Sequence, residues 1–343
     1  MTAHPPGTTE DPTVVGGFVP VVDVDGRDGS PARRREIARA IDTACRESGF
    51  FGIVGHGVDL SLIQRMHDVT VDLFSTPDAE KAALLVPPDD PTLRGIFARA
   101  GSVSAAEDIT TSPDLCELFT MNQLGEPGVA EVAGLGDAYD VWSRPNVWPE
   151  RPAGFKETWL EYYRQVSDLS ADLMRLCALG LGLDEEFFTP FVDIHSSNLT
   201  ANWYPPVDTD PLPDQYRKGP HSDWGTLTIL YQDNCGGLQV FDKAGDWIDV
   251  PVVEGGFVVN IGDLMAVWTN DEWVSTKHRV LAPTGEMARK PRVSLAFFHQ
   301  PNWSADIECL PSCQGPGKPA KYAPTTSGAY LLQKMESAFG SAE

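Results

Sequence analysis

Two histidines and an aspartate carry the clearest chemical signal in this chain. His221 and Asp223 stand two positions apart in GPHSDWG (219–225), and His278 follows in STKHRV (275–280). On an extended segment, side chains at i and i+2 leave the same face, so the first pair presents an imidazole and a carboxylate side by side. Two imidazoles and a carboxylate cover one face of an iron(II) octahedron and leave three positions open, although the same donors also suit zinc. We therefore expect these three side chains to bind one metal ion.

A second pair of residues is suited to binding a carboxylate. Arg292 and Ser294 are again two positions apart, in RVSLAFFHQP (292–301). A guanidinium binds a carboxylate in a bidentate manner, and the hydroxyl adds a donor. The segment is mostly apolar, so an inward-pointing Arg292 needs an anionic partner, whereas a surface ion pair is the alternative. Tyr204, in NWYPP (202–206), offers its hydroxyl to the same carboxylate.

The composition excludes several classes of partner. The formal net charge of −23 at pH 7 argues against nucleic acid, whose phosphates require clustered Lys and Arg. No apolar run is long enough to span a membrane. The first residues, MTAHPPGTTEDPT, lack the basic and apolar regions of a secretory signal, and the six cysteines contain no C-x-x-C pair. We expect a cytoplasmic monomer or weak dimer with reduced thiols and a disordered tail over residues 1–16.

The elements that must position these side chains change in kind along the chain. Residues 17–198 predict a helical region, because apolar residues recur at helical spacing from Ser30-Pro31, over 60–74 and from 154 to about 183. Short strands are expected there too, at 18–24, 50–54, 95–97 and 115–119. Residues 199–303 instead predict a sandwich or jelly roll packed against that region, and 304–343 a loop and a helix (330–339) that cover the site. Its expected strands are 199–204, 226–232, 238–241, 247–250, 257–261, 265–269, 278–282 and 293–299.

The order of these motifs resembles the isopenicillin N synthase-like family of 2-oxoglutarate/Fe(II)-dependent dioxygenases. The resemblance covers about residues 18–339 and includes VPVVDV, GFFGIVGHGV, NVWP, NWYPP, HSDWGTLTIL, GGLQV, NIGD, STKHRV and RVSLAFFHQP. It implies a mixed, mainly β fold: a double-stranded β-helix core (a cupin-like jelly roll) with N-terminal and flanking helices. It also implies Fe(II) on His221, Asp223 and His278. The far carboxylate of the cosubstrate 2-oxoglutarate would be bound by Arg292 and Ser294, with help from Tyr204 and Asn202.

The resemblance implies an enzyme that uses 2-oxoglutarate and O₂ to hydroxylate, desaturate or cyclise a small molecule at an unactivated C–H bond. The expected substrate contacts are Phe97, Met121, Phe298 and Tyr330. A composition rich in Ala, Gly and Asp, with more Arg than Lys, is typical of high-GC bacteria. Bacterial secondary metabolism, such as antibiotic biosynthesis, is therefore the expected setting.

Two other functions remain open at this stage. Isopenicillin N synthase and aminocyclopropane-carboxylate oxidase share the R-x-S pair of Arg292 and Ser294 and do not use 2-oxoglutarate. An oxidase that takes all four electrons from its own substrate is therefore one alternative. A non-catalytic jelly-roll protein whose three ligands hold zinc is another, from a different class. The residues do not identify the substrate or choose among hydroxylation, desaturation and cyclisation.

Overall fold

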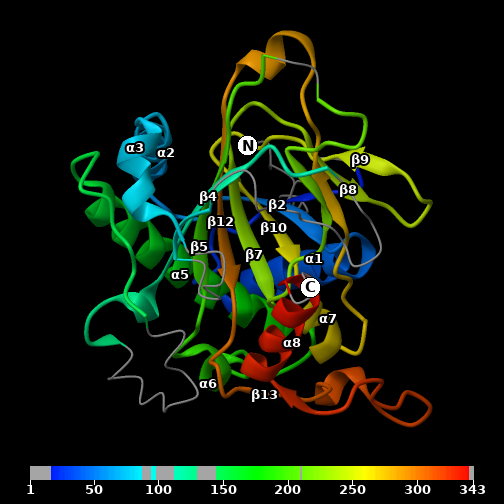
Figure 1. The fold of residues 1–343 in the computed structure, drawn as a ribbon. Helices are drawn as coiled ribbons and strands as arrows, with labels where there is room; N and C mark the ends of the chain where they lie inside the picture. The colour runs from blue at the N-terminus through cyan, green and yellow to red at the C-terminus, as the bar shows by residue number, and fades with distance from the viewer. Residues whose placement is uncertain (1–16, 87–93, 98–111, 130–143, 209–210, 340–343) are drawn as a thin grey trace, which may run out of the picture.

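Two β-sheets form the centre of the molecule. The structure, a computed structural model, describes residues 17–86, 94–97, 112–129, 144–208 and 211–339 (Figure 1). The large sheet has the strand order β1-β2-β10-β7-β12-β5-β4-β3, and the small sheet has the order β6-β11-β8-β9. The strands of the large sheet, in that order, are Val21–Asp23, Phe50–Val54, Phe257–Ile261, Leu227–Gln232, Arg292–His299, Asn198–Tyr204, Glu117–Asn122 and Gly95–Phe97. Those of the small sheet are Lys218–His221, His278–Val280, Leu238–Phe241 and Trp247–Asp249.

The two faces of the large sheet have different partners. In β7, Leu227 and Ile229 belong to the main apolar core that the helices share, whereas Thr228 and Leu230 line a cavity on the inner face. This alternation follows from the period of two in an extended strand. A second apolar cluster joins inner-face residues of the large sheet to Leu238, Val240 and Val280 of the small sheet. The two sheets therefore face each other, as in a double-stranded β-helix.

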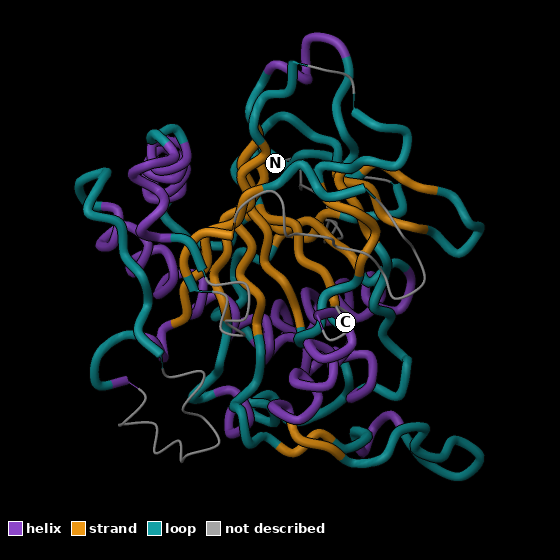
Figure 2. Tube along the Cα trace, viewed as in Figure 1, coloured by secondary structure: helices purple, strands orange, loops and turns teal. Residues whose placement is uncertain are grey.

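Three helices cover the outer face of the large sheet, and Figure 2 shows the strands in the middle of the molecule with helices around them. These helices are α1 (Pro31–Glu47), α2 (Leu60–Phe74) and α5 (Phe155–Gly180). Helix α1 begins as the sequence predicts, because the Ser30 side chain accepts a hydrogen bond from the Arg33 amide and Pro31 occupies the first turn. The shorter elements are α3 (Asp78–Lys81), α6 (Thr189–Val192), α7 (Asp263–Trp268), α8 (Ser327–Phe339), β13 (Asp306–Ile307) and β14 (Thr325–Thr326). No helix in the described ranges combines the length and apolar character needed to cross a membrane.

Most of the expected elements are present, with one clear error. The segment 265–269 was expected to be a strand, but its residues form most of α7. A short apolar run does not distinguish a strand from a buried helical turn by periodicity. Here the backbone turns after Gly262, and Leu264, Met265 and Trp268 are buried at helical spacing. The region 17–198 also contributes more than helices, because β1 to β4 extend the large sheet at both edges.

Candidate active site

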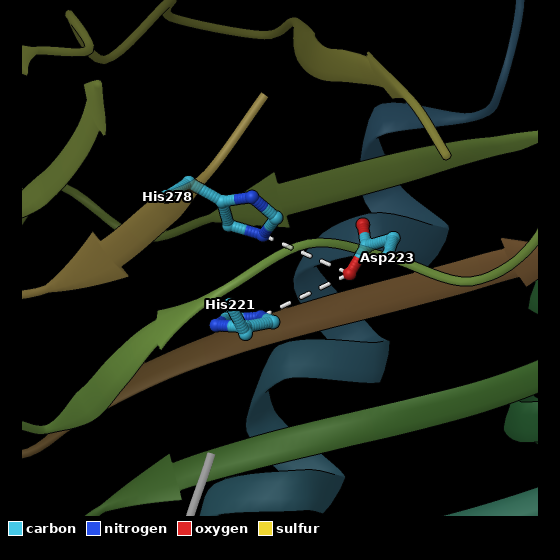
Figure 3. Close-up of side chains that lie close together, drawn as sticks. All are labelled: His221, Asp223 and His278. Carbon is cyan, nitrogen blue, oxygen red and sulfur yellow. Dashed lines mark ion pairs between the residues drawn. The ribbon is translucent and has the colours of Figure 1, made fainter. Parts of the chain in front are cut away.

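Three side chains converge between the two sheets. His221 ends β6 and lies directly opposite His278, the first residue of β11. Asp223 follows β6, and its Oδ1 lies 3.8 Å from His221 Nε2 and 3.7 Å from His278 Nε2. Figure 3 shows the three side chains pointing toward one another. Within the described ranges, they are the one group of three or more such side chains whose donor atoms lie close enough for a single metal ion.

Hydrogen bonds orient each of these three donors. The Oδ2 atom of Asp223 accepts bonds from Thr228 Oγ1 at 2.5 Å and from Asn260 Nδ2 at 2.7 Å, which directs Oδ1 toward the imidazoles. The Nδ1 atom of His221 lies 2.8 Å from the carbonyl of Gly219, and that of His278 lies 3.2 Å from the carbonyl of Thr276. A ring that donates from Nδ1–H presents the lone pair of Nε2 to a metal. The arrangement therefore fits an ion bound on one face.

The surroundings of the donors favour the protonation states that metal binding requires. Burial lowers the pKa of His221 to about 3, and the neighbouring His278 and Lys218 act in the same direction. Burial alone would raise the pKa of Asp223, but His278, His221 and the bonds from Asn260 and Thr228 hold this pKa below its usual value. At neutral pH, His221 is therefore neutral and Asp223 is ionised, as ligands of a divalent cation must be.

The guanidinium of Arg292 lies at the inner face of the large sheet and is 1% exposed. Its Nε donates to the carbonyl of Gly236 at 2.9 Å, and its terminal nitrogens donate to Gln232 Oε1 and Ser294 Oγ, each at 3.3 Å. It also lies 4.9 Å from the ring centroid of Tyr204. All of these partners are neutral, and no Asp or Glu of the described chain forms an ion pair with it. A buried cation without a counterion fits the far carboxylate of a dicarboxylate ligand.

One cavity connects the metal ligands with this guanidinium. It encloses, with its mouth, about 440 Å³. Asn202, Tyr204 and Phe298 line it, together with the three converging side chains and Arg292, so the structure brings most of the sequence-predicted site residues together. The remaining lining residues are Phe50, Lys218, Thr228, Leu230, Leu238, Asn260, Val280 and Ala296.

Three of the expected substrate contacts lie outside the wall of this cavity. Met121 pairs with Leu199 on the outer face of the large sheet and is fully buried in the core beneath the helices, so it does not line this cavity. Tyr330 lies on α8 and lines a different cavity beside Asp263. Phe97 pairs with Leu118, which in turn pairs with Asn202, so Phe97 shares the inner face but does not line the cavity.

Sequence reasoning missed three polar residues of the site. Asn260 begins the NIGD motif, and Thr228 alternates with the core residues of β7, so the motif and the strand period could have indicated both. Lys218 gave no such signal. It stands three positions before His221, which on a regular strand places it on the opposite face.

Comparison with known proteins agrees with this geometry. Residues 195–301 match the family model of the 2OG-Fe(II) oxygenase superfamily, and residues 19–151 match that of the non-haem dioxygenase in morphine synthesis N-terminal region. The chain is 34% identical to a validamycin A dioxygenase of Streptomyces hygroscopicus subsp. limoneus, over 88% of this chain and 82% of that protein. It is also 34% identical to a homoarginine-6-hydroxylase of Oryza sativa subsp. japonica, over 88% of each.

Solved structures of similar proteins share the whole fold. A full-length Neurospora crassa protein in complex with alpha-KG superposes with a TM-score of 0.81 at 30% identity, covering 93% of this chain and 96% of that one. The structure of JOX2 in complex with 2OG, Fe and JA gives a TM-score of 0.74 at 30% identity, covering 92% and 84%. The chain therefore belongs to the isopenicillin N synthase-like family within the 2OG-Fe(II) oxygenase superfamily, and it is a dioxygenase that depends on Fe(II) and 2-oxoglutarate.

Proposed function

We propose that this dioxygenase oxidises an unactivated C–H bond of a small molecule in bacterial secondary metabolism. The observation that carries the use of 2-oxoglutarate by this site is the buried Arg292, which has only neutral partners and lines the same cavity as His221, Asp223 and His278. The Streptomyces relative is named for validamycin A, and the Oryza relative for hydroxylation of homoarginine. These names support a small organic substrate, and the first supports the metabolic setting.

We assign each predicted site residue a role in that reaction. His221, Asp223 and His278 would hold Fe(II) through Nε2, Oδ1 and Nε2. Arg292 would bind the far carboxylate of 2-oxoglutarate. This role is supported by its two terminal nitrogens, which have only long bonds to neutral acceptors.

Three neighbours would complete the cosubstrate site. Ser294 lies beside the guanidinium and adds a hydroxyl donor. Tyr204 pairs with Arg292 across the two strands, and Asn202 pairs with Ser294, so both reach the same end of the cavity. Burial raises the pKa of Tyr204, which keeps its phenol protonated and able to donate.

When bound, Fe(II) and 2-oxoglutarate would activate O₂, because 2-oxoglutarate would supply two of the four electrons that reduce O₂ and would itself be oxidised to succinate and CO₂. The protein holds its ligands and the substrate in place and excludes water. Thr228 and Asn260 keep one oxygen of Asp223 occupied, so that only the other faces the metal. Apolar side chains of Leu230, Leu238 and Phe298 form the wall that a substrate carbon would contact, and Phe97 stays a candidate at its edge. In a hydroxylation, one oxygen atom of O₂ enters the substrate and the other enters succinate.

The proposal is tested by two linked measurements. Under anaerobic conditions, Fe(II) and 2-oxoglutarate should together produce a visible charge-transfer band, which Asp223→Ala should abolish and Asp249→Ala, at an exposed carboxylate of β9, should retain. With O₂, one succinate should form for each O₂ consumed. Consumption of O₂ without succinate would indicate the oxidase alternative. Absence of both the band and O₂ consumption would indicate a non-catalytic metal-binding protein.

A further inference from the structure

A bulge in β6 turns a lysine into the cavity. His221 pairs with His278, and Lys218 pairs with Val280, so three steps along β6 face two steps along β11. Without this irregularity, Lys218 and His221 would leave opposite faces of the strand. The extra residue of a β-bulge changes the direction of the following side chains. As a result, both side chains line the same cavity.

The ammonium of Lys218 has no counterion among the described residues. Its Nζ reaches from the small sheet to the large sheet, where it donates to Asn202 Oδ1 at 3.1 Å. Asn202 is 4% exposed, so this contact lies inside the molecule. No Asp or Glu in the described ranges forms an ion pair with Lys218. A half-buried ammonium bonded only to a neutral amide loses hydration without gaining a charge partner.

The charge of Lys218 also remains unbalanced once the cofactors are counted. Fe(II) and Arg292 together carry as many positive charges as Asp223 and the two carboxylates of 2-oxoglutarate carry negative ones. The iron-binding imidazoles are neutral. Arg217, which is buried behind Tyr204 and donates to the carbonyl of Lys290 at 2.9 Å, adds a further positive charge nearby. Asp114, whose Oδ1 accepts a hydrogen bond from the Gly219 amide at 2.9 Å, adds one negative charge that balances Arg217, so the charge of Lys218 is left over.

We propose that Lys218 binds a carboxylate of the primary substrate, and hence that the substrate is a small carboxylic acid with an apolar body. This inference rests on the proposed function, since it concerns the same cavity. Leu238 and Val280 line the cavity from the same small sheet as Lys218, and Phe298 faces them from the large sheet. The substrate's charged end would lie at the ammonium, and its carbon skeleton would lie along these apolar side chains.

Matched acid and amide pairs test this inference without knowledge of the natural substrate. The probes are phenylacetate with phenylacetamide, and hexanoate with hexanamide. Each is titrated into the anaerobic protein loaded with Fe(II) and 2-oxoglutarate, and the shift of the charge-transfer band gives its Kd. We expect the acids to bind about tenfold to a hundredfold more tightly than the amides, as for a charge-assisted hydrogen bond. Lys218→Met should abolish this preference.

Two further substitutions of Lys218 distinguish binding of a carboxylate by its charge from a purely structural hydrogen bond to Asn202. Lys218→Arg keeps the charge and should keep the preference for acids. Lys218→Gln keeps a donor for Asn202 but not the charge, and should lose the preference. If Lys218→Gln preserves it, the lysine only positions Asn202 and the inference is wrong. Lys290→Met removes an exposed lysine outside the cavity and should leave the Kd values of the acids and amides unchanged.

The same titrations contain the outcomes that overturn the inference. Equal binding of acids and amides, or no binding of either acid, would exclude an anionic substrate at Lys218. A loss of 2-oxoglutarate affinity in Lys218→Met, equal to the loss of acid affinity, would assign the ammonium to the cosubstrate instead. Absence of the band itself would remove the proposed function and this inference together, whereas a normal band without acid preference removes only this inference.

Discussion

Replacing Arg292 with methionine should weaken 2-oxoglutarate binding severely while leaving the protein folded. Methionine fills much of the same volume in β12 but cannot donate a hydrogen bond. The cosubstrate would then still bind to iron at one end but would have its far carboxylate buried without a cation. We expect the metal affinity to remain close to that of the unchanged protein, because no atom of Arg292 bonds to the three metal-binding side chains.

The magnitude follows from the contacts of the guanidinium. Its two terminal nitrogens face neutral acceptors at 3.3 Å, so both are able to turn to an incoming carboxylate. Removing one partner of a buried, hydrogen-bonded charge pair costs about 2 to 5 kcal/mol, which corresponds to a Kd for 2-oxoglutarate raised roughly 30-fold to several thousandfold. The free energy of unfolding without ligand should change by only about 1 kcal/mol. The lost bonds to Gly236 and Gln232 are offset because a charge no longer has to be buried without a counterion.

Anaerobic titration of the charge-transfer band with 2-oxoglutarate measures the predicted change. A thermal melt supplies a second readout, because a ligand at 100 times its Kd stabilises a protein by about 2.7 kcal/mol. The variant should lose that gain at the same ligand concentration. Arg292→Lys keeps the charge but not the planar guanidinium, so its Kd for 2-oxoglutarate should lie between those of the unchanged protein and Arg292→Met. Arg279→Met is the matched control, because this half-buried arginine stacks over Trp247 outside the cavity. Unchanged 2-oxoglutarate affinity in Arg292→Met would refute the assigned role.

Three further changes test other parts of the structure. Burial lowers the pKa of His195 from 6.5 to about 4. Between these two pH values the unfolded state binds more protons than the folded state. The free energy of unfolding should therefore fall by up to about 3 kcal/mol as the pH drops from 6.5 to 4. In denaturant melts, the free energy of unfolding of His195→Asn should fall less over this pH range than that of the unchanged protein, and an equal fall would contradict the prediction. Lys334→Met removes the 3.0 Å ion pair that ties α8 to Asp263 and should speed proteolysis of the C-terminal segment, which an unchanged digestion rate would disprove. In Gly262→Ala the added methyl overlaps the Gly225 carbonyl, so we expect about 1 to 3 kcal/mol of destabilisation in melts and weaker Fe(II) binding, whereas wild-type values would show that the turn adjusts freely.

The parts of the site that lie within short motifs could be predicted from the sequence. His221 and Asp223 are separated by one residue, and Arg292 and Ser294 lie on one regular strand, so local geometry brings each pair to one face. Local geometry does not bring His278 to His221 and Asp223. Only the order of the family's motifs implied that β11 lies against β6. The helices over 31–47 and 60–74 follow from apolar periodicity and from side-chain caps, which are local properties too.

The errors arise where long-range packing decides. Met121 and Thr120 are adjacent in β4, and the sequence does not tell which of them lies on the inner face of the sheet, because both faces of this strand are buried. The run 265–269 is apolar enough for either a strand or a helical turn, and the start of the turn is held by long-range hydrogen bonds from the Asp263 and Leu264 amides to the carbonyls of Asp223 and Gly225. Lys218 was missed because strand alternation, applied from His221, assigns it to the wrong face. A one-residue irregularity in pairing is not visible in the sequence.

The irregular pairing in β6 has a consequence for how such enzymes diversify. The metal ligand His221 and Lys218, the proposed substrate-binding residue, share one four-residue strand. They pair with His278 and Val280 of β11 on opposite sides of the irregularity. If β6 instead paired regularly, with no residue removed, Gly219 rather than Lys218 would lie opposite Val280, and His221 would stay opposite His278. A shift of pairing in this one short strand would then change the side chain that faces the substrate, while the iron ligands stay in place.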